Sequence, residues 1–328
     1  MKQWKIAAIA AATVLATLGS TGAMAAEQYM PVLSYRTGPY APNGVPIADG
    51  IVDYMKLVNE RGGINGVKLL IEECETAYDT ARSVECYERT KAAIQPWSTG
   101  ATFALTEKAP IDKISLVTLG YGRSESADGS VFKWNFPLAG NYWVGADVII
   151  QAIGKREGGM DKLKGKKIAL IYHDSPYGKE SIPMVRERAK MLGFSVMELP
   201  VAHPGVEQKA TWLQIRKERP DYVIMWGFGV MNSTALKEAQ ATGYPRDKMY
   251  GSWWAGAEPD TRDAGEAAKG YNAVALQNSA DKNAAVVKET LGKLYAQGKG
   301  TASTKDEVGS VLWLRGAMSS MVVVEGIR

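Results

Sequence analysis

The sequence predicts an α/β protein built from two doubly wound parallel-sheet lobes joined by a hinge. Apolar runs of strand length alternate along the chain with helical patterns of roughly ten to fifteen residues, which is typical of parallel βαβ units. The alternation begins again near residue 143, and the second series resembles the first. About 300 residues follow the N-terminal leader, more than one hydrophobic core usually holds, so we expect two domains.

Residues 1–25 have the pattern of a secretory signal peptide. Lys2 and Lys5 precede an uncharged apolar run at 6–18, and Ala23-Met24-Ala25 matches a cleavage site. The run is too short to cross a bilayer as a helix, and no later segment reaches the roughly 18 apolar residues that a membrane helix needs. We therefore expect the mature protein to be exported to the periplasm.

Charge and cysteine content exclude several classes of protein. The net charge of +4 is mild, and lysines and arginines are interspersed with acids, so we expect no nucleic-acid partner. Cys74 and Cys86 are the only cysteines, and an even pair in an exported chain predicts one disulfide. The only histidines, His173 and His203, are distant in sequence from both cysteines, so no metal site is expected.

The first series of elements is expected between residues 29 and 136. A long loop at 36–44 separates the first strand from a helix whose apolar residues recur at three- and four-residue steps. Gly62-Gly63 ends that helix, and Asp79 begins the next one. Strands are predicted at 29–35, 67–71, 92–94 and 114–119, an extended segment at 132–136, and helices at 47–58, 80–91 and 101–108.

The second series restarts at an amphipathic helix that Asn141 opens. We assign residues 26–140 and 277–328 to the first lobe and residues 141–276 to the second. The strands of this series are predicted at 168–172, 194–199, 222–226, 248–251 and 271–276. The helices from here to the end of the chain are predicted at 141–153, 179–192, 207–218, 232–242, 283–297 and 305–328.

The segment Gln95–Gly100 is the leading candidate for a ligand site. It joins a predicted strand to a helix that Ser98 or Thr99 caps, so hydroxyls, free backbone N–H groups and the positive end of a helix dipole meet there. Such a place binds an anion. Pro96 and Trp97 add an apolar wall, which favours a ligand with a negative end and an apolar body. Taken alone, the same residues describe an ordinary capped helix.

Other strand ends have a similar character. Ligands of doubly wound sheets lie outside the carboxyl ends of the strands, and aromatic residues gather there in this chain. Adjacent Trp253 and Trp254 cannot both enter one core, so one is expected to face the cleft. Arg36 or Arg123 is a candidate counter-charge for a carboxylate, although both also fit the rim. The residues expected to line the cleft are Tyr40, Trp97, Ser98, Thr99, Gly120, Tyr121, Gly122, Tyr177, Trp226, Phe228 and Trp253.

Catalytic and nucleotide-binding motifs are missing. Gly227-Phe228-Gly229 starts like a dinucleotide fingerprint, but Asn232 stands where the third glycine belongs. No phosphate-binding loop, zinc-protease motif or nucleophile elbow occurs. His173 precedes Asp174, yet no motif places a nucleophile. We therefore expect a binding protein without a cofactor, with an exported enzyme as the weaker alternative.

The chain resembles, from Tyr29 to its end, the periplasmic solute-binding proteins of branched-chain amino acid type ABC transporters. The resemblance implies a type I bilobed fold, a small-molecule ligand, and permease subunits in the inner membrane as partners. The motifs that carry it are Thr37-Gly38-Pro39-Tyr40, the run from Val58 to Gly66, the run from Tyr172 to Gly178, and the helix after Trp226-Gly227.

Family members hold the ligand carboxylate with a Ser/Thr pair, which matches Ser98 and Thr99. The resemblance also implies that Gly120-Tyr121-Gly122 and Tyr177 assist. Thr102, one turn into the same helix, is a further hydroxyl candidate. Family members usually continue past the helix that matches the end of this chain, so we expect the chain to be a truncated form.

One departure concerns the ligand's ammonium group. Amino-acid binders of the family surround it with a tyrosine and an acid, where this chain has Phe228 and Trp253. Neither side chain neutralises a buried cation, so a carboxylate without an amine fits better. The resemblance to members with aromatic-rich pockets implies a small apolar, aromatic acid such as a benzoate or cinnamate derivative. A branched-chain amino acid, a larger apolar ligand and a sensing role stay open as alternatives.

Overall fold

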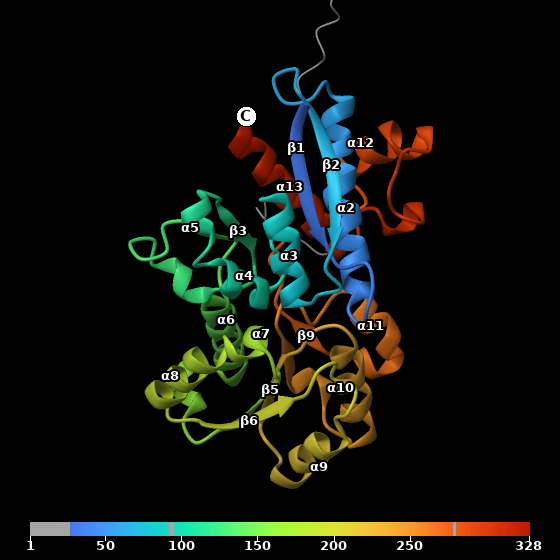
Figure 1. Cartoon of the computed structure of the whole chain (residues 1–328). Coiled ribbons are helices and arrows are strands. Elements are labelled where there is room, and N and C mark those ends of the chain that lie inside the picture. Colours follow the sequence, from blue (N-terminus) through green and yellow to red (C-terminus); the bar gives the residue numbers. More distant parts are fainter. Residues whose placement is uncertain (1–26, 92–94, 278–279) are drawn as a thin grey trace, which may run out of the picture.

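The computed structural model describes residues 27–91, 95–277 and 280–328. It confirms the α/β class with parallel sheets, and the elements form two groups, one above the other (Figure 1). We call residues 27–140 and 280–328 the upper half and residues 141–277 the lower half, while the predicted lobe boundaries stay a prediction. The predicted signal peptide and the predicted strand at 92–94 lie outside the described residues.

The lower half contains one parallel sheet. Its strands are β5 (Lys167–His173), β6 (Ser195–Val201), β7 (Tyr222–Trp226), β8 (Met249–Gly251) and β9 (Asn272–Ala273). Their spatial order is β6-β5-β7-β8-β9. β7 is buried along its whole length, as expected for a central parallel strand covered on both faces. This order puts the topological switch point between β5 and β7, where doubly wound folds bind their ligands.

Helices of the lower half connect these strands. One prediction was wrong, because the helix expected at 179–192 is divided into two helices. Pro176 and Pro183 each stand in a first helical turn, where the missing N–H needs no partner, so each begins its own helix. The helices are α6 (Tyr142–Glu157), α7 (Pro176–Lys179), α8 (Ile182–Leu192), α9 (Lys209–Glu218), α10 (Val230–Ala241) and α11 (Glu258–Ala264).

The upper half contains two pairs of parallel strands in the part that the structure describes. β1 (Glu27–Ser34) pairs with β2 (Lys68–Glu75), and β3 (Leu116–Leu119) pairs with β4 (Asn135–Leu138). The helices around them are α2 (Ala41–Glu60), α3 (Thr80–Thr90), α4 (Thr99–Leu105), α5 (Ala109–Asp112), α12 (Ala285–Lys293) and α13 (Val311–Ile327).

Two predicted boundaries in the upper half were wrong. The loop expected at 36–44 ends early, because α2 begins at Ala41 and tolerates a proline in its first turn. The helix expected at 305–328 is interrupted at Gly309, whose φ of 88° lies in the left-handed region that glycine adopts readily. Ser310 then caps α13, where its Oγ accepts the Trp313 N–H at 3.3 Å.

The predicted disulfide is present. Cys74 in β2 is bonded to Cys86 in α3, with 5.9 Å between their Cα atoms. As predicted, Asp79 begins α3, and its carboxylate accepts the Arg82 N–H at 2.8 Å. The strand and the helix that follows it are therefore joined covalently as well as through the cap.

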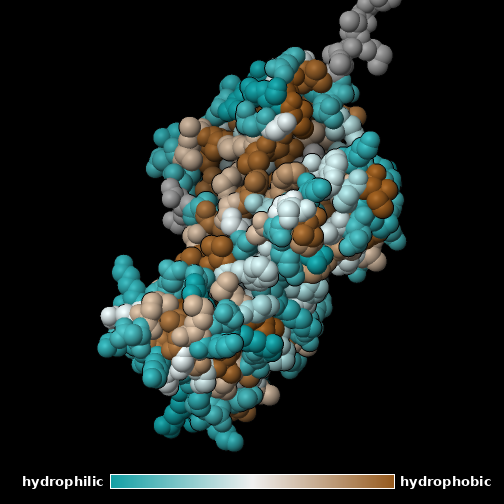
Figure 2. All heavy atoms as spheres, turned by 90° about the vertical axis from the view of Figure 1, so that its left-hand side faces the viewer, coloured by the Kyte–Doolittle hydropathy of each residue, from teal (hydrophilic) through white to brown (hydrophobic). Residues whose placement is uncertain are grey.

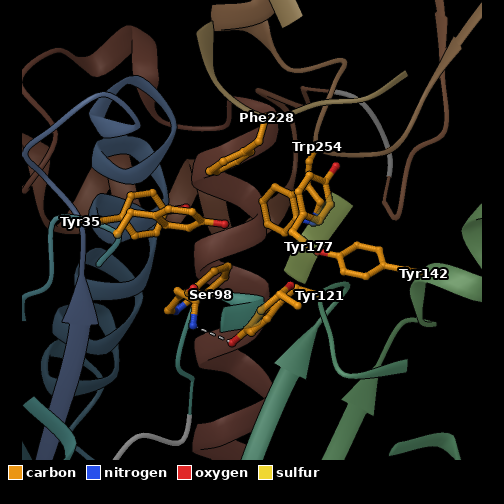
Figure 3. A pocket seen from close by; sticks show the side chains of 10 residues that line it. Tyr35, Ser98, Tyr121, Tyr142, Tyr177, Phe228 and Trp254 are labelled. Carbon is orange, nitrogen blue, oxygen red and sulfur yellow. Dashed lines mark hydrogen bonds between the residues drawn. The ribbon is translucent and has the colours of Figure 1, made fainter. Parts of the chain in front are cut away.

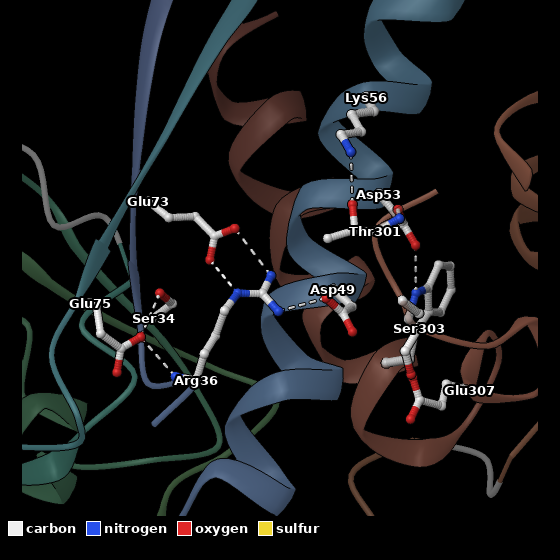
Figure 4. A network of polar contacts seen from close by, with 12 residues as sticks. Ser34, Arg36, Asp49, Asp53, Lys56, Glu73, Glu75, Thr301, Ser303 and Glu307 are labelled. Carbon is white, nitrogen blue, oxygen red and sulfur yellow. Dashed lines mark hydrogen bonds and ion pairs between the residues drawn. The ribbon is translucent and has the colours of Figure 1, made fainter. Parts of the chain in front are cut away.

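The helices α2 and α13 approach each other at backbone distance. A Cβ added to Gly50 would lie 2.0 Å from the carbonyl oxygen of Trp313, and one added to Gly316 would lie 2.0 Å from that of Ile47. Asp53 on α2 also accepts the Trp313 indole N–H at 3.1 Å (Figure 4). The two glycines thus allow the last helix to complete the core of the upper half.

Apolar side chains gather on the surface of the upper half, where Figure 2 shows a band of brown residues. A groove between β1 and α13 is lined in part by Tyr29, Met30, Val32, Val323 and Ile327. Within residues 27–91, 95–277 and 280–328, none of the helices combines the length and the apolarity that a bilayer crossing requires.

Replacing Gly316 by alanine is expected to lower the free energy of unfolding by about 1–3 kcal/mol, because the new methyl group overpacks a backbone contact. Gly326→Ala is the matched control, since it lies on the same helix with nothing within 4 Å of its Cβ position. That variant should keep or slightly raise stability, as alanine favours helix. Urea denaturation compares the two, and equal unfolding free energies would contradict the close helix contact.

Candidate ligand-binding site

A cavity lies between the two halves, and ten side chains line it (Figure 3). The space that they leave for the centre of a water molecule is about 10 Å³, roughly what a single water needs. Most of them stand just beyond the carboxyl ends of strands, where doubly wound folds place their ligands. The lining residues are Tyr35, Tyr78, Trp97, Ser98, Thr99, Tyr121, Tyr142, Tyr177, Phe228 and Trp254.

Ser98 and Thr99 lie on the upper side of the cavity, at the start of α4. Of the two predicted capping candidates, Ser98 caps this helix, because its Oγ accepts the Ala101 N–H at 3.3 Å, and Thr99 is the first helical residue. Thr99 Oγ1 accepts the Gly122 backbone N–H at 3.3 Å. Both hydroxyls therefore have protein partners in this closed arrangement.

Two further upper-half residues support this wall. Trp97 donates its backbone N–H to the Tyr121 hydroxyl at 2.9 Å, and the two rings stack with centroids 5.6 Å apart. Gly122 donates its N–H to Thr99 Oγ1 at 3.3 Å, so it positions the wall from behind. Thr102, a hydroxyl candidate, instead donates to the Ser98 carbonyl at 2.9 Å and is fully buried in the helix.

Aromatic rings form the lower side of the cavity. Tyr177 follows β5 and donates its hydroxyl to the Gly227 carbonyl at 3.0 Å. Phe228 follows β7 and meets Trp254 edge to face, with ring centroids 5.7 Å apart. Trp226 lies behind these rings, fully buried, and does not line the cavity. Carbon-rich surfaces thus face the hydroxyls of the upper side.

Trp253 and Trp254 differ from the expectation. The segment after β8 is a turn and not an extended strand, so both indoles point the same way. Each indole N–H donates to the Gly120 carbonyl, at 2.5 Å and 2.9 Å, across the two halves. Trp254 lines the cavity, whereas Trp253 stacks on Tyr142 with 5.6 Å between centroids and lies outside the lining. Gly120 therefore acts through its backbone oxygen.

Tyr40 also lies outside the lining, in a contact between the halves. Its hydroxyl is 2.6 Å from His173 Nε2 and 2.5 Å from His203 Nδ1. His173 Nδ1 in turn is 2.8 Å from Ser175 Oγ. Burial, and then the neighbouring His203, lower the pKa of the His173 imidazole to about 4, so it is neutral at pH 7.

The two predicted counter-charges are occupied elsewhere. Arg36 forms ion pairs with Asp49 and Glu73, at 2.7 Å each (Figure 4). Arg123 lies over the rings of Phe103 and Phe132, 4.7 Å and 4.8 Å from their centroids, and neither arginine lines the cavity.

Burial shapes the acid–base properties of the site. Desolvation raises the pKa of the Tyr35, Tyr121 and Tyr177 hydroxyls, so they remain protonated donors. Glu180 lies just outside the lining and accepts the Ser124 backbone N–H at 2.8 Å, a contact between the halves. Desolvation raises the pKa of its carboxyl to about 7. None of the ten lining side chains carries a full charge at neutral pH.

Sequence reasoning missed Tyr35, Tyr78 and Tyr142 as lining residues. Tyr35 and Tyr78 follow β1 and β2, so the rule that ligands lie at strand ends could have found them. Tyr142 stands at the start of α6, and no pattern in the sequence distinguishes it. No cluster of three or more potential metal ligands of the His, Cys, Asp or Glu type occurs in the described part of the chain.

The geometry defines a class of protein, one whose two α/β halves enclose a small ligand cavity at their strand ends. A family model described as periplasmic binding protein matches residues 27–317. The chain therefore belongs to the periplasmic binding protein family. Members of this family are binding proteins, in agreement with the missing catalytic motifs.

Relatives and solved structures agree with this assignment. The Leu/Ile/Val-binding protein homolog 7 of Brucella suis is 25% identical over 77% of this chain. The match covers 65% of that relative, so the chain spans less than two thirds of its length. A structure from the Pseudomonas fluorescens group, described as an ABC transporter permease, is 41% identical with a TM-score of 0.82, covering 92% of this chain and 74% of that one.

Two more distant structures share the fold. A Thermus thermophilus branched-chain amino acid ABC transporter protein with bound valine is 22% identical, with a TM-score of 0.76 and coverage of 92% and 78% of the two chains. A solute-binding protein from R. palustris in complex with benzoate is 16% identical, with a TM-score of 0.72 and coverage of 92% and 80%. Because both ligand types occur on this fold, the fold alone does not identify the ligand.

The buried His173 makes stability depend on pH. Its imidazole has a pKa near 6.5 in an unfolded chain and about 4 here, so the unfolded state binds the proton first as pH falls. Stability is therefore lost between pH 6.5 and 4. The carboxyl of Glu180 acts oppositely, because its raised pKa favours the folded state at low pH.

A His173→Gln variant separates the two effects. From pH 7 to pH 4.5, wild type should lose about 2 kcal/mol more unfolding free energy than the variant, measured by urea denaturation at each pH. Parallel pH profiles of the two proteins would contradict the buried neutral imidazole.

Proposed function

We propose that this protein is the periplasmic receptor of an ABC importer, and that it captures a small apolar, aromatic carboxylate between its two halves for delivery to a membrane permease. The observation that carries the proposal is the cavity, which faces hydroxyls on one side and aromatic rings on the other. Family membership supports the binding and transport role.

The lining favours an acid without an amine. Ser98 and Thr99 offer hydroxyls to a carboxylate, while Tyr177, Phe228 and Trp254 offer ring surface to an apolar body. An ammonium group would find no carboxylate among the lining residues, and an unpaired buried cation costs several kcal/mol. Amino acids are therefore the weaker candidates, although the Brucella relatives are named for leucine, isoleucine and valine binding.

Ligand entry requires movement. The cavity leaves only about 10 Å³ for the centre of a water molecule, roughly the need of one water, so it has no room for an aromatic acid in the closed arrangement. The halves are joined by discrete contacts, such as those from the two indoles to Gly120 and from Glu180 to Ser124, which can separate and re-form. A ligand that touches both halves favours closure through contacts that the open form lacks.

A calorimetric screen tests the ligand class, using benzoate, cinnamate, leucine, valine and octanoate. We expect the aromatic acids to bind and the amino acids to bind at least tenfold more weakly, since 1.4 kcal/mol corresponds to a factor of ten. Tight binding of leucine or valine would identify an amino-acid receptor, and tight binding of octanoate alone would identify a receptor for larger apolar acids.

A double variant tests the hydroxyl wall. Ser98→Ala with Thr99→Ala should weaken binding of the preferred acid by at least about 1 kcal/mol, because hydrogen bonds to a charged group contribute roughly 1.5–3 kcal/mol. Ser310→Ala is the matched control, because it also removes a helix cap, at α13, from a residue outside the lining. Unchanged affinity in the double variant would exclude these hydroxyls as the carboxylate contact.

A further inference from the structure

Arg315 on α13 is a buried cation whose guanidinium lacks part of its hydrogen bonds in the described part of the chain. The residue is 1% exposed, and its Nε and Nη1 atoms contact no acceptor among the described residues. Its guanidinium lies 4.3 Å from the centroid of the Trp254 ring, so an aromatic face is the neighbour that the structure gives it. Buried charges are normally paired, which makes this arginine an exception that requires an explanation.

The nearby buried acid does not neutralise it. Asp260 is the carboxyl whose field acts on Arg315, but no ion pair joins the two within the described chain. The Asp260 carboxylate accepts the Ala257 backbone N–H at 3.0 Å, and burial raises the pKa of this carboxyl to about 7. Burial lowers the pKa of the Arg315 guanidinium only to about 10, so the arginine remains charged at neutral pH.

The cation lies close to the cavity. Trp254, whose ring the guanidinium contacts, is a lining residue, so one aromatic ring separates Arg315 from the cavity. Figure 3 shows the C-terminal helix α13 running behind the lining side chains. The positive charge therefore acts on the cavity from its rear, through an interior of low effective dielectric constant where charges interact strongly.

We propose that Arg315 supplies the positive charge that selects an anionic ligand over a neutral one of the same shape. The inference rests on the proposed function and deepens it, because it divides recognition between two groups. Hydroxyls such as those of Ser98 and Thr99 donate hydrogen bonds to the oxygen of a carboxylate or of an amide alike. A buried cation instead distinguishes the charged ligand, because its field favours a negative end in the cavity and leaves a neutral group of the same shape nearly unaffected.

Benzoate and benzamide test this role, because they match in size and differ in charge. We expect wild type to bind benzoate at least tenfold more tightly than benzamide in calorimetric titrations, the ratio typical of charge-assisted hydrogen bonds. Arg315→Met should weaken benzoate binding at least tenfold and change benzamide binding less than twofold. Arg315→Lys keeps the charge and should preserve part of the preference for benzoate.

Two measurements distinguish this role from a structural one. Without ligand, Arg315→Met should unfold at the same or a higher temperature than wild type, because an unpaired buried cation is removed. Arg36→Met is the control, since its cation is paired with Asp49 and Glu73. It should unfold at a lower temperature and keep the wild-type ratio of benzoate to benzamide affinity.

The outcomes separate the two proposals. If wild type binds benzoate and Arg315→Met keeps the wild-type affinity ratio, the charge-selection role is overturned and the proposed function stands. A lower unfolding temperature of Arg315→Met with an unchanged ratio would show a purely structural arginine. If wild type binds neither benzoate nor cinnamate, the proposed ligand class is wrong and the role of Arg315 in selecting it is overturned as well.

Discussion

The backbone carbonyl of Gly120 accepts hydrogen bonds from both Trp253 and Trp254, and this contact holds the two halves together over the cavity. A carbonyl oxygen has two lone pairs, so one acceptor satisfies two buried donors. The contacts of Tyr40 with the two histidines and of Glu180 with Ser124 join the halves at other points. Hydrogen bonds of this kind exchange for water at small net cost, which suits a joint that opens.

The surroundings of the cavity combine hydroxyls that already accept hydrogen bonds with a buried cation, Arg315, that lacks part of its hydrogen bonds among the described residues. Ser98 Oγ accepts the Ala101 N–H and Thr99 Oγ1 accepts the Gly122 N–H, so both hydroxyl oxygens already have partners. Arg315 has no such bond to lose at its buried Nε and Nη1 atoms. In the proposed mechanism, hydrogen bonds from the hydroxyls to the ligand replace similar bonds between the ligand and water, whereas the charge of Arg315 favours an anionic ligand over a neutral one.

Local patterns in the sequence predicted much of the fold. The strand at 222–226 was expected from its apolar run, and the Asp79 and Ser98 caps were expected from their position before helices. Such features depend on residues within about four positions of one another. The errors arose where a single residue interrupts a helical pattern, as Pro183 and Gly309 do, because periodicity continues across the break.

The sequence by itself determined the α/β class, the alternation of strands and helices, the pair Cys74 and Cys86, and the strand ends that meet at the cavity. Tertiary structure decided which of Trp253 and Trp254 lines that cavity, that Tyr40 meets both histidines, and that Arg315 is buried with its Nε and Nη1 unpaired among the described residues. The physical reason is the distance along the chain over which each interaction acts. Caps and periodicity act between near neighbours, whereas a contact such as that between Gly120 and Trp253 joins residues more than a hundred positions apart. The burial of a side chain depends on every element that packs around it.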